Sequence, residues 1–153
     1  DRCFVLKHSG NRTKKLNYNF VNEPDLAQTF VVTCVLLNIP FRFTGLQSLK
    51  IKETDRIEAL KTELRKLGYL LTDSNNSILE WNGERCEPQA HPVITTYEDH
   101  RMAMAFAPAA LVLPEGIEIA DPQVVSKSYP HYWRDLRTAG FIIIDNEQLA
   151  IDN

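Results

Sequence analysis

The sequence predicts a mixed α/β (α+β) fold built from repeated βαβ-type units. Apolar residues recur at helical spacing in several segments, and short β-type runs separate those segments. Helix-then-strand units begin near Asp25, Asp55 and Asp99, although the copies differ too much in sequence to prove a repeat. No low-complexity segment or linker interrupts them. We therefore expect residues 1–153 to form a single domain.

The first predicted helix covers about residues 25–37. Asp25 and Gln28 have the spacing of a capping box at its start, and apolar side chains follow at helical intervals. Pro40 cannot continue a helix, so the helix should end before it. Residues 41–43, followed by a turn at Gly45, predict a strand.

The second predicted helix is the clearest element, because one side is apolar and the other is charged. The apolar stripe contains Ile57, Leu60, Leu64 and Leu67, and the charged side is assigned Glu58, Lys61, Glu63, Arg65 and Lys66. Asp55 and Glu58 can cap its start, and Gly68 can end it. Two strands should follow at residues 69–71 and 78–81, joined by a polar turn at 73–76, with another turn at Asn82-Gly83.

The third predicted helix begins near Asp99 and is apolar on nearly all sides up to residue 106, which places it in the core. Pro108 should either bend it or cut it short. Residues 117–120 predict a strand, Asp121-Pro122 a turn, and residues 129–139 a final helix.

Composition excludes several classes of protein. The chain is 44% apolar and 24% charged with a net charge of -3, which is typical of a globular domain large enough to bury a core. It lacks the basic face that a nucleic-acid partner requires, and no apolar run reaches the roughly 20 residues of a bilayer span. Cys3, Cys34 and Cys86 are far apart and form no CxxC pair, which disfavours a disulfide scaffold and a zinc site and favours the cytoplasm. We place Cys34 in the core, on the apolar side of its helix.

Two predicted helix starts carry cations where the helix dipole favours acidic residues. Arg56 follows Asp55, and His100 and Arg101 follow Asp99. Cations beside free backbone N–H groups would strengthen an anion site. The alternative is that each arginine pairs with a nearby carboxylate in solvent. The residues alone thus predict an α/β domain with an anion-binding edge and leave the substrate open.

The segment before the second helix contains both signs of charge. Lys52 and Arg56 could hold anionic oxygens, and Glu53 between them could donate or accept a proton. The alternative is a solvated loop. His100 has a side chain suited to proton transfer, although a single histidine at a helix start is more often structural.

Four motifs follow one another along residues 17–141. They are Glu23-Pro24-Asp25-Leu26-Ala27-Gln28, Lys52-Glu53-Thr54-Asp55-Arg56, Asp99-His100-Arg101-Met102-Ala103-Met104, and Asp121-Pro122 followed by Lys127-Ser128-Tyr129-Pro130. Together they resemble the enolpyruvyl transferases, and within these the 5-enolpyruvylshikimate-3-phosphate synthases. The UDP-N-acetylglucosamine enolpyruvyl transferases share the fold and chemistry but lack the second and third motifs, so they are a distant alternative.

The resemblance implies transfer of the enolpyruvyl group of phosphoenolpyruvate to the 5-hydroxyl of shikimate 3-phosphate, with release of phosphate and without a metal or other cofactor. Both substrates carry several negative charges, so such a site must gather cations. The pathway implied is the shikimate pathway of aromatic amino acid biosynthesis.

The resemblance also implies a role for each matching residue. Asp25 would take the proton of the 5-hydroxyl, and Glu53, helped by His100, would protonate the methylene carbon; which group performs which proton transfer stays open. Arg56, Arg101 and Lys127 would bind phosphoenolpyruvate, Lys52 would bind shikimate 3-phosphate, and Ser48 stands where the family often has an asparagine that contacts shikimate 3-phosphate.

Family members are much longer than this chain and consist of two domains with the active site between them. The motifs match only the C-terminal part, and the chain begins with Asp1, so we expect a piece of a longer protein whose N-terminal domain is its partner. We expect the chain alone to be inactive. A non-catalytic anion-binding module is the alternative, and residues 142–153 carry no functional prediction.

Overall fold

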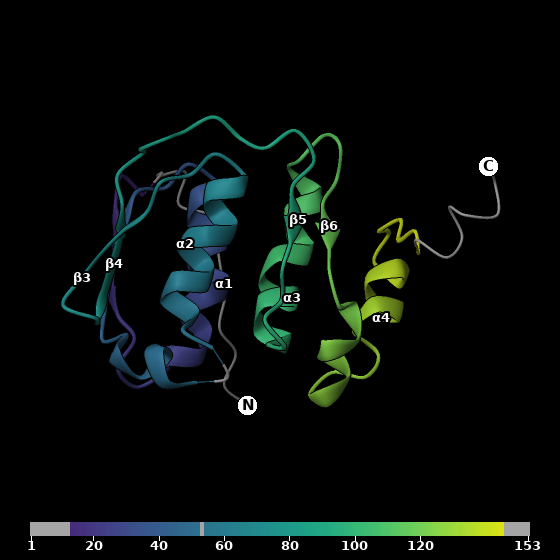
Figure 1. The fold of residues 1–153 in the computed structure, drawn as a ribbon, viewed down its shortest axis with the longest axis horizontal. Coiled ribbons are helices and arrows are strands. Elements are labelled where there is room, and N and C mark those ends of the chain that lie inside the picture. The colour runs from purple at the N-terminus through teal and green to yellow at the C-terminus, as the bar shows by residue number, and fades with distance from the viewer. Residues whose placement is uncertain (1–12, 53, 146–153) are drawn as a thin grey trace, which may run out of the picture.

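The computed structural model describes residues 13–52 and 54–145 (Figure 1). Its strands are β1 (Leu16–Asn19), β2 (Phe41–Thr44), β3 (Thr72–Ser74), β4 (Ile78–Trp81), β5 (Val93–Ile94) and β6 (Glu118–Ile119). Its α-helices are α1 (Ala27–Leu36), α2 (Arg56–Lys66), α3 (His100–Phe106) and α4 (Tyr132–Thr138). Four 3-10 helices complete it: η1 (Pro24–Leu26), η2 (Gln47–Ile51), η3 (Ala107–Leu111) and η4 (Pro122–Lys127).

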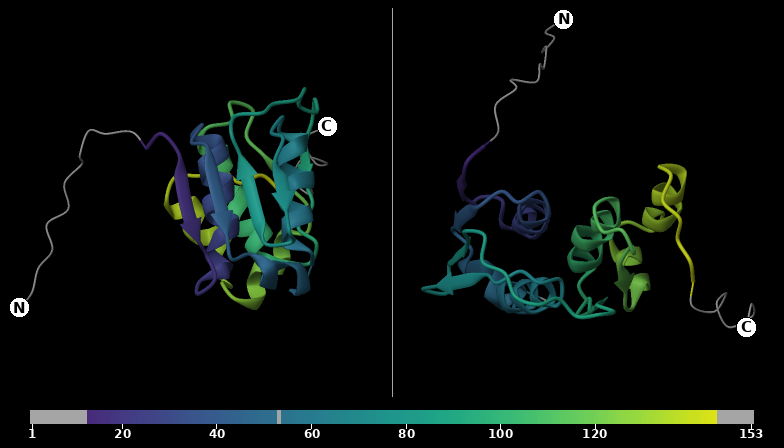
Figure 2. Two further views of the ribbon diagram at one scale, coloured as in Figure 1. Left: turned by 90° about the vertical axis from the view of Figure 1, so that its left-hand side faces the viewer. Right: turned by 90° about the horizontal axis from the view of Figure 1, so that it is seen from above.

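The first part, residues 16–81, is a four-stranded sheet with two helices on one face, and we call it the sheet unit. The strand order is β1-β2-β4-β3, with β1 parallel to β2 and the other pairs antiparallel. Figures 1 and 2 show α1 and α2 side by side on the same face of this sheet. Buried and partly exposed residues alternate along β2, so Phe41 and Phe43 enter the core on that face.

The second part, residues 93–138, is smaller, and we call it the α3 unit. Strand β5 pairs with β6 in parallel, and α3 connects them in the sequence. Helix α3 packs against α1 and against η4, and α4 lies at the far side of this unit (Figure 1). Both parts thus contain a βαβ connection, as the sequence predicts.

Several predicted elements are confirmed. Helix α2 begins as expected, because an Asp55 side-chain oxygen accepts a hydrogen bond from the Glu58 backbone N–H at 3.1 Å. Helix α3 is buried as predicted, and it ends at Phe106, where a 3-10 helix containing Pro108 begins. Cys34 lies in the core, where burial raises the pKa of its thiol to about 11.

The predicted capping box at the first helix is wrong. Asp25 lies in η1, and α1 begins at Ala27 with no side-chain cap. The side chains of Asp25 and Gln28 bind groups from other elements instead. Long-range ionic contacts therefore override the local capping signal.

Strand positions also differ from the prediction. Strand β3 covers 72–74 instead of 69–71, because the turn lies at Asn75 and Asn76, which both adopt a left-handed backbone conformation. Strands β1 and β5 are additional and short. Strand β1 is largely exposed, whereas β5 has one exposed residue, Val93, and one buried residue, Ile94. The last helix begins at Tyr132 instead of residue 129, because Pro130 and His131 form a turn first.

One residue of α2 was assigned to the wrong side of the helix. Glu63 has no exposed surface, although the sequence pattern placed it with the charged residues. Three residues of the predicted apolar stripe, Ile57, Leu60 and Leu64, are buried as expected.

No helix in the described part of the chain combines the length and the apolar character needed to cross a membrane.

Candidate anion-binding site

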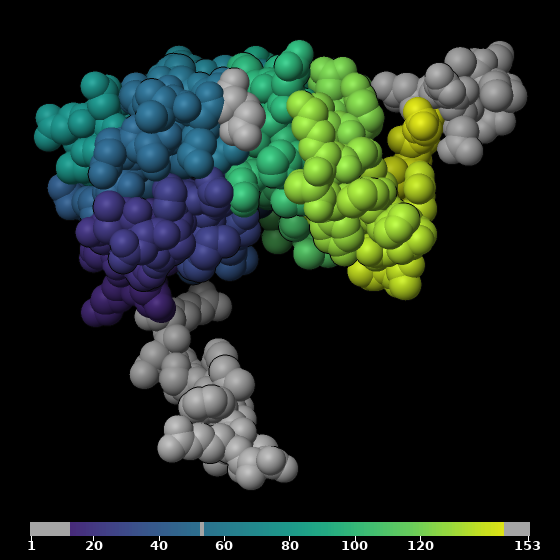
Figure 3. Space-filling view, turned by 90° about the horizontal axis from the view of Figure 1, so that it is seen from below, coloured from purple at the N-terminus to yellow at the C-terminus, as the bar shows by residue number. Residues whose placement is uncertain are grey.

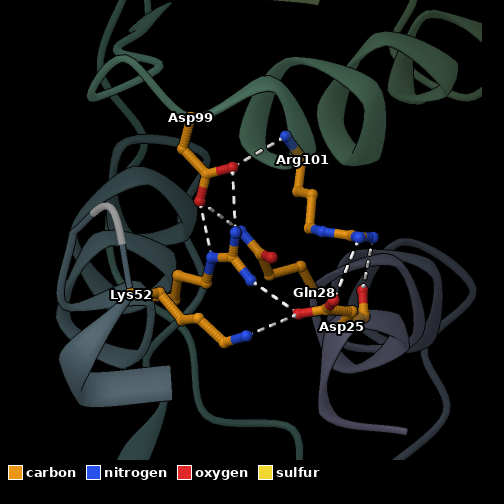
Figure 4. A network of polar contacts seen from close by, with 6 residues as sticks. Asp25, Gln28, Lys52, Asp99 and Arg101 are labelled. Atoms are coloured by element: carbon orange, nitrogen blue, oxygen red, sulfur yellow. Dashed lines mark hydrogen bonds and ion pairs between the residues drawn. The ribbon is translucent and has the colours of Figure 1, made fainter. Parts of the chain in front are cut away.

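The beginnings of α1, α2 and α3 meet at one edge of the molecule, at the bottom of Figure 1. Figure 3 views this edge directly, where the purple and blue surface of the sheet unit lies beside the green surface of the α3 unit. Charged side chains from the two units contact one another here (Figure 4).

Arg56, the first residue of α2, is held by Asp99 of the α3 unit. Its Nε donates to Asp99 Oδ2 at 2.7 Å and its Nη2 to Asp99 Oδ1 at 3.3 Å. Both side chains are buried, with exposed fractions of 1% and 0%. This two-point contact fixes the plane of the guanidinium group.

Asp99 also caps α3. Its Oδ1 accepts a hydrogen bond from the backbone N–H of Arg101 at 2.9 Å. One buried carboxylate therefore orients Arg56 and the first turn of the helix that carries Arg101.

Asp25 lies among three cations. Its Oδ1 accepts from Arg56 Nη1 at 2.9 Å and is 3.5 Å from Lys52 Nζ, and its Oδ2 accepts from Arg101 Nη2 at 3.0 Å. Arg101 Nη1 also donates to the Asp25 backbone carbonyl at 3.3 Å. The Asp25 side chain is 40% exposed, so this carboxylate is open to solvent while Asp99 is not.

The surroundings of Asp25 keep it ionised. Partial burial raises the pKa of Asp25, but the charges of Arg101 and Lys52 and the hydrogen bond from Arg56 outweigh it, so the pKa lies below its usual value. In the part of the chain that the structure describes, Lys52, Arg56 and Arg101 contact two carboxylates, and the side chains of Lys52 and Arg101 stay 35% and 30% exposed. The arrangement can therefore accept an anion.

Gln28 belongs to the same network, which sequence reasoning missed because it assigned this residue to a helix cap. The side chain is fully buried, and its Nε2 lies 3.5 Å from Asp99 Oδ2. Its Oε1 is buried without a hydrogen-bond partner in the described part of the chain. The signal available in the sequence was its position three residues after Asp25, a spacing that places two side chains on the same face of a helical turn.

The predicted site residues do not all meet. Asp25, Lys52, Arg56 and Arg101 come together, as the network above shows. His100 is the half-buried first residue of α3, Ser48 is half-buried in η2, and Lys127 is exposed at the end of η4. In the described part of the chain, these three make no hydrogen bond or ion pair with Asp25, Asp99 or Arg101. Glu53 lies outside the described residues.

The arginines at the helix starts match neither interpretation completely. Arg56 does pair with carboxylates, as the simpler interpretation expected, but it is buried instead of solvated.

Within residues 13–52 and 54–145, no three potential metal-ligating side chains lie together.

Comparison with known proteins identifies close relatives. The family model of EPSP synthase (3-phosphoshikimate 1-carboxyvinyltransferase) matches residues 2–136. The 3-phosphoshikimate 1-carboxyvinyltransferase of Bacteroides fragilis strain YCH46 is 71% identical over 143 residues, which cover 94% of this chain and 35% of that protein. The protein of the same name from Laribacter hongkongensis is 41% identical over 125 residues, which cover 82% of this chain and 28% of that protein.

A solved structure gives the same result. The 2.37 Å structure of EPSP synthase from Acinetobacter baumannii matches with a TM-score of 0.58 and 25% identity, over 71% of this chain and 25% of that chain. This chain therefore spans about a third or less of the length of these relatives. The predicted mixed α/β fold is confirmed, and it is a portion of the enolpyruvyl transferase fold. The matches of sequence, motifs and fold show that this chain belongs to the EPSP synthase (3-phosphoshikimate 1-carboxyvinyltransferase) family.

Proposed function

We propose that this chain supplies the cationic part of the active site of an EPSP synthase. The complete protein would transfer the enolpyruvyl group of phosphoenolpyruvate to the 5-hydroxyl of shikimate 3-phosphate and release phosphate, in aromatic amino acid biosynthesis. The observation that carries this proposal is the convergence of Lys52, Arg56 and Arg101 on one solvent-open carboxylate. Neutral or apolar substrates would not require such a cluster.

The three cations differ in how firmly they are held. Arg56 is fixed by buried Asp99, whereas Lys52 and Arg101 have side chains that are 35% and 30% exposed. A carboxylate or phosphate of the substrate can therefore take the position beside Arg56 that Asp25 now partly fills, and Lys52 and Arg101 can turn towards it. Arg56 and Arg101 bind phosphoenolpyruvate in this proposal, and Lys52 binds shikimate 3-phosphate.

Release of Asp25 from these ion pairs also prepares it for catalysis. The oxygen of the 5-hydroxyl forms a bond to C2 of phosphoenolpyruvate, its proton passes to Asp25, and C3 gains a proton from Glu53 with help from His100. Cleavage of the bond between C2 and the phosphate oxygen, with loss of a proton from C3, releases phosphate and restores the double bond. Each cation lowers the energy of the charge that develops on the departing phosphate.

The remaining predicted residues complete the site in this proposal. Lys127 adds a further contact to phosphoenolpyruvate, and Ser48 adds one to shikimate 3-phosphate. The second half of the site comes from the N-terminal domain of the same protein, in the cytoplasm, and no metal or organic cofactor takes part. The isolated chain does not turn over.

Phosphate release tests the proposal. The assay contains phosphoenolpyruvate and shikimate 3-phosphate, with this chain alone and then with the separately produced N-terminal remainder of the protein. Activity in the mixture alone is the expected result. Steady phosphate release from the chain alone, or none from a mixture in which both pieces are folded, would contradict it, and the second outcome would favour a non-catalytic anion-binding module.

A further inference from the structure

A second polar cluster links α2 to the segment that leads into α3. Lys66 Nζ donates to the backbone carbonyl of Val93 at 2.9 Å and lies 3.4 Å from Thr95 Oγ1. Glu63 accepts from the Thr95 backbone N–H at 3.0 Å and from the Tyr97 hydroxyl at 2.7 Å. The cluster lies on the same helix as Arg56 and outside the site described above.

The contacts of Arg56 and of Glu63 with this segment follow from the regular spacing of residues on both sides. Glu63 is seven residues after Arg56, two helical turns along α2, so both side chains leave the helix on the same side. Along the facing segment, Thr95, Tyr97 and Asp99 are alternate residues, and all three bind α2. Glu63 and Arg56 thus hold this segment at two points.

Glu63 is built into the interior. Its side chain is 0% exposed, and Lys66 Nζ lies 2.6 Å from its Oε2. A buried carboxylate is costly unless it is paired and hydrogen-bonded. Glu63 meets both conditions through Lys66, Tyr97 and the Thr95 backbone.

The segment that Glu63 holds is strained. Tyr97 and Glu98 have φ angles of 54° and 56°, the left-handed region that non-glycine residues rarely adopt. Such conformations persist only where surrounding contacts enforce them, and they are concentrated at functional sites. These two residues directly precede Asp99, whose backbone N–H donates to the Thr96 carbonyl at 2.9 Å.

We propose that Glu63 is a positioning residue for the anion site. It holds Thr95 and Tyr97 so that the strained turn places Asp99 where it can orient Arg56. The ligand named in its test, phosphoenolpyruvate, rests on the proposed function, but the effect on Arg56 does not.

Three variants of the full chain test this role. Glu63→Leu removes every polar contact of the side chain and keeps an apolar group in the core. Glu63→Gln keeps one oxygen that can accept from the Thr95 backbone N–H, and its amide NH2 can donate to the Tyr97 hydroxyl oxygen. Tyr97→Phe removes that hydroxyl. Glu58→Gln is the matched control, because Glu58 forms the corresponding exposed pair with Lys61, also three residues away on α2.

Two readouts are needed. The first is solvent exchange of the Arg56 Nε–H by nuclear magnetic resonance, which reports its buried hydrogen bond to Asp99. The second is the affinity for phosphoenolpyruvate by calorimetry. We expect Glu63→Leu to speed Arg56 Nε–H exchange relative to core backbone amides and to weaken binding about tenfold, or about 1.4 kcal/mol. Tyr97→Phe should show a smaller change in the same direction, Glu63→Gln should restore most of the exchange protection and affinity, and Glu58→Gln should match the wild type.

The outcomes separate this proposal from the proposed function. If the wild-type chain binds no phosphoenolpyruvate even when mixed with the N-terminal remainder of the protein, the proposed function loses its support, and Arg56 exchange still decides the role of Glu63. Unchanged Arg56 exchange in Glu63→Leu, or in Tyr97→Phe should the leucine variant not fold, would overturn the positioning role. A uniform rise in exchange at all sites would also overturn it, because it would show a general loss of stability.

Discussion

The sheet unit and the α3 unit are stabilised differently. In the sheet unit, two helices cover a four-stranded sheet, and large side chains such as Phe41, Phe43 and Trp81 are buried between them. In the α3 unit, the strands have two residues each. A small hydrophobic cluster there contains Ala103 of α3 and Val124 and Val125 of η4. The α3 unit therefore depends more on its contacts with α1 and α2, and many of these contacts are polar. The candidate site lies where the two units meet, so the residues proposed to bind the anion also join the two units.

Breaking the buried contact between the units should have the largest effect. Asp99→Ala removes the buried carboxylate that pairs with the Arg56 guanidinium and removes the cap of α3. We expect the free energy of unfolding to fall by about 3–5 kcal/mol, measured by urea denaturation. Glu80→Ala is the control, because its pair with Arg42 is partly exposed and should contribute less than about 1 kcal/mol. Equal losses in the two variants would show that the site does not join the units.

A cavity within the α3 unit should have a smaller and more local effect. Val125 is 1% exposed and belongs to the same hydrophobic cluster as Ala103 of α3. Val125→Ala removes two buried methyl groups and should lower the free energy of unfolding by about 2 kcal/mol. Hydrogen exchange should show lost protection in α3 and unchanged protection in β2 and β4. If β2 and β4 lose protection equally, the two units unfold as one, and the distinction drawn here is wrong.

The smallest effect should come from the exposed carboxylate between the units. Asp25→Asn removes its ion pairs, and because the Asp25 side chain is 40% exposed, we expect a loss of less than about 1 kcal/mol at pH 7. Since the cations lower the folded-state pKa of Asp25, its contribution is present above the usual value of 3.8 and is lost as pH falls through the lower folded value. Acid unfolding curves of the wild type and the variant should therefore converge below pH 3.8.

The control for this acid experiment is Glu115→Gln, which changes an exposed carboxylate outside the network. A difference between wild type and Asp25→Asn that persists through the acid range would show that the carboxylate charge is not its cause.

The same contrast explains which parts of the fold the sequence predicts. Helix α2 follows directly from its apolar stripe and its Asp55 cap, which are local signals. Strand β1 is difficult to predict, because it contains two asparagines and mostly exposed side chains and is defined by its pairing with β2. Strand β5 has two residues and likewise depends on a partner distant in sequence. Elements that depend on non-local pairing leave little trace in local spacing.

The site shows the same limit. Charge at the helix starts predicts an anion-binding edge that includes Arg56 and Arg101, but the sequence does not show that Asp25 lies between these two arginines. Asp25 has the spacing of a capping residue, and only the tertiary fold brings α2 and α3 to it. The burial of Glu63 could have been predicted from the sequence, because Glu63 follows Arg56 by two helical turns and therefore lies beside the apolar stripe of α2.

The central claim, that the cations at the meeting point of the two units bind one anionic substrate, is tested most directly by calorimetric titration of the chain with phosphoenolpyruvate. Arg101→Ala removes a partly exposed cation of the site, and Arg65→Ala removes an exposed cation from α2 outside it. We expect Arg101→Ala to weaken binding about tenfold or more and Arg65→Ala to leave it unchanged. Equal affinity in the wild type and Arg101→Ala, or an equal loss in both variants, would contradict the claim.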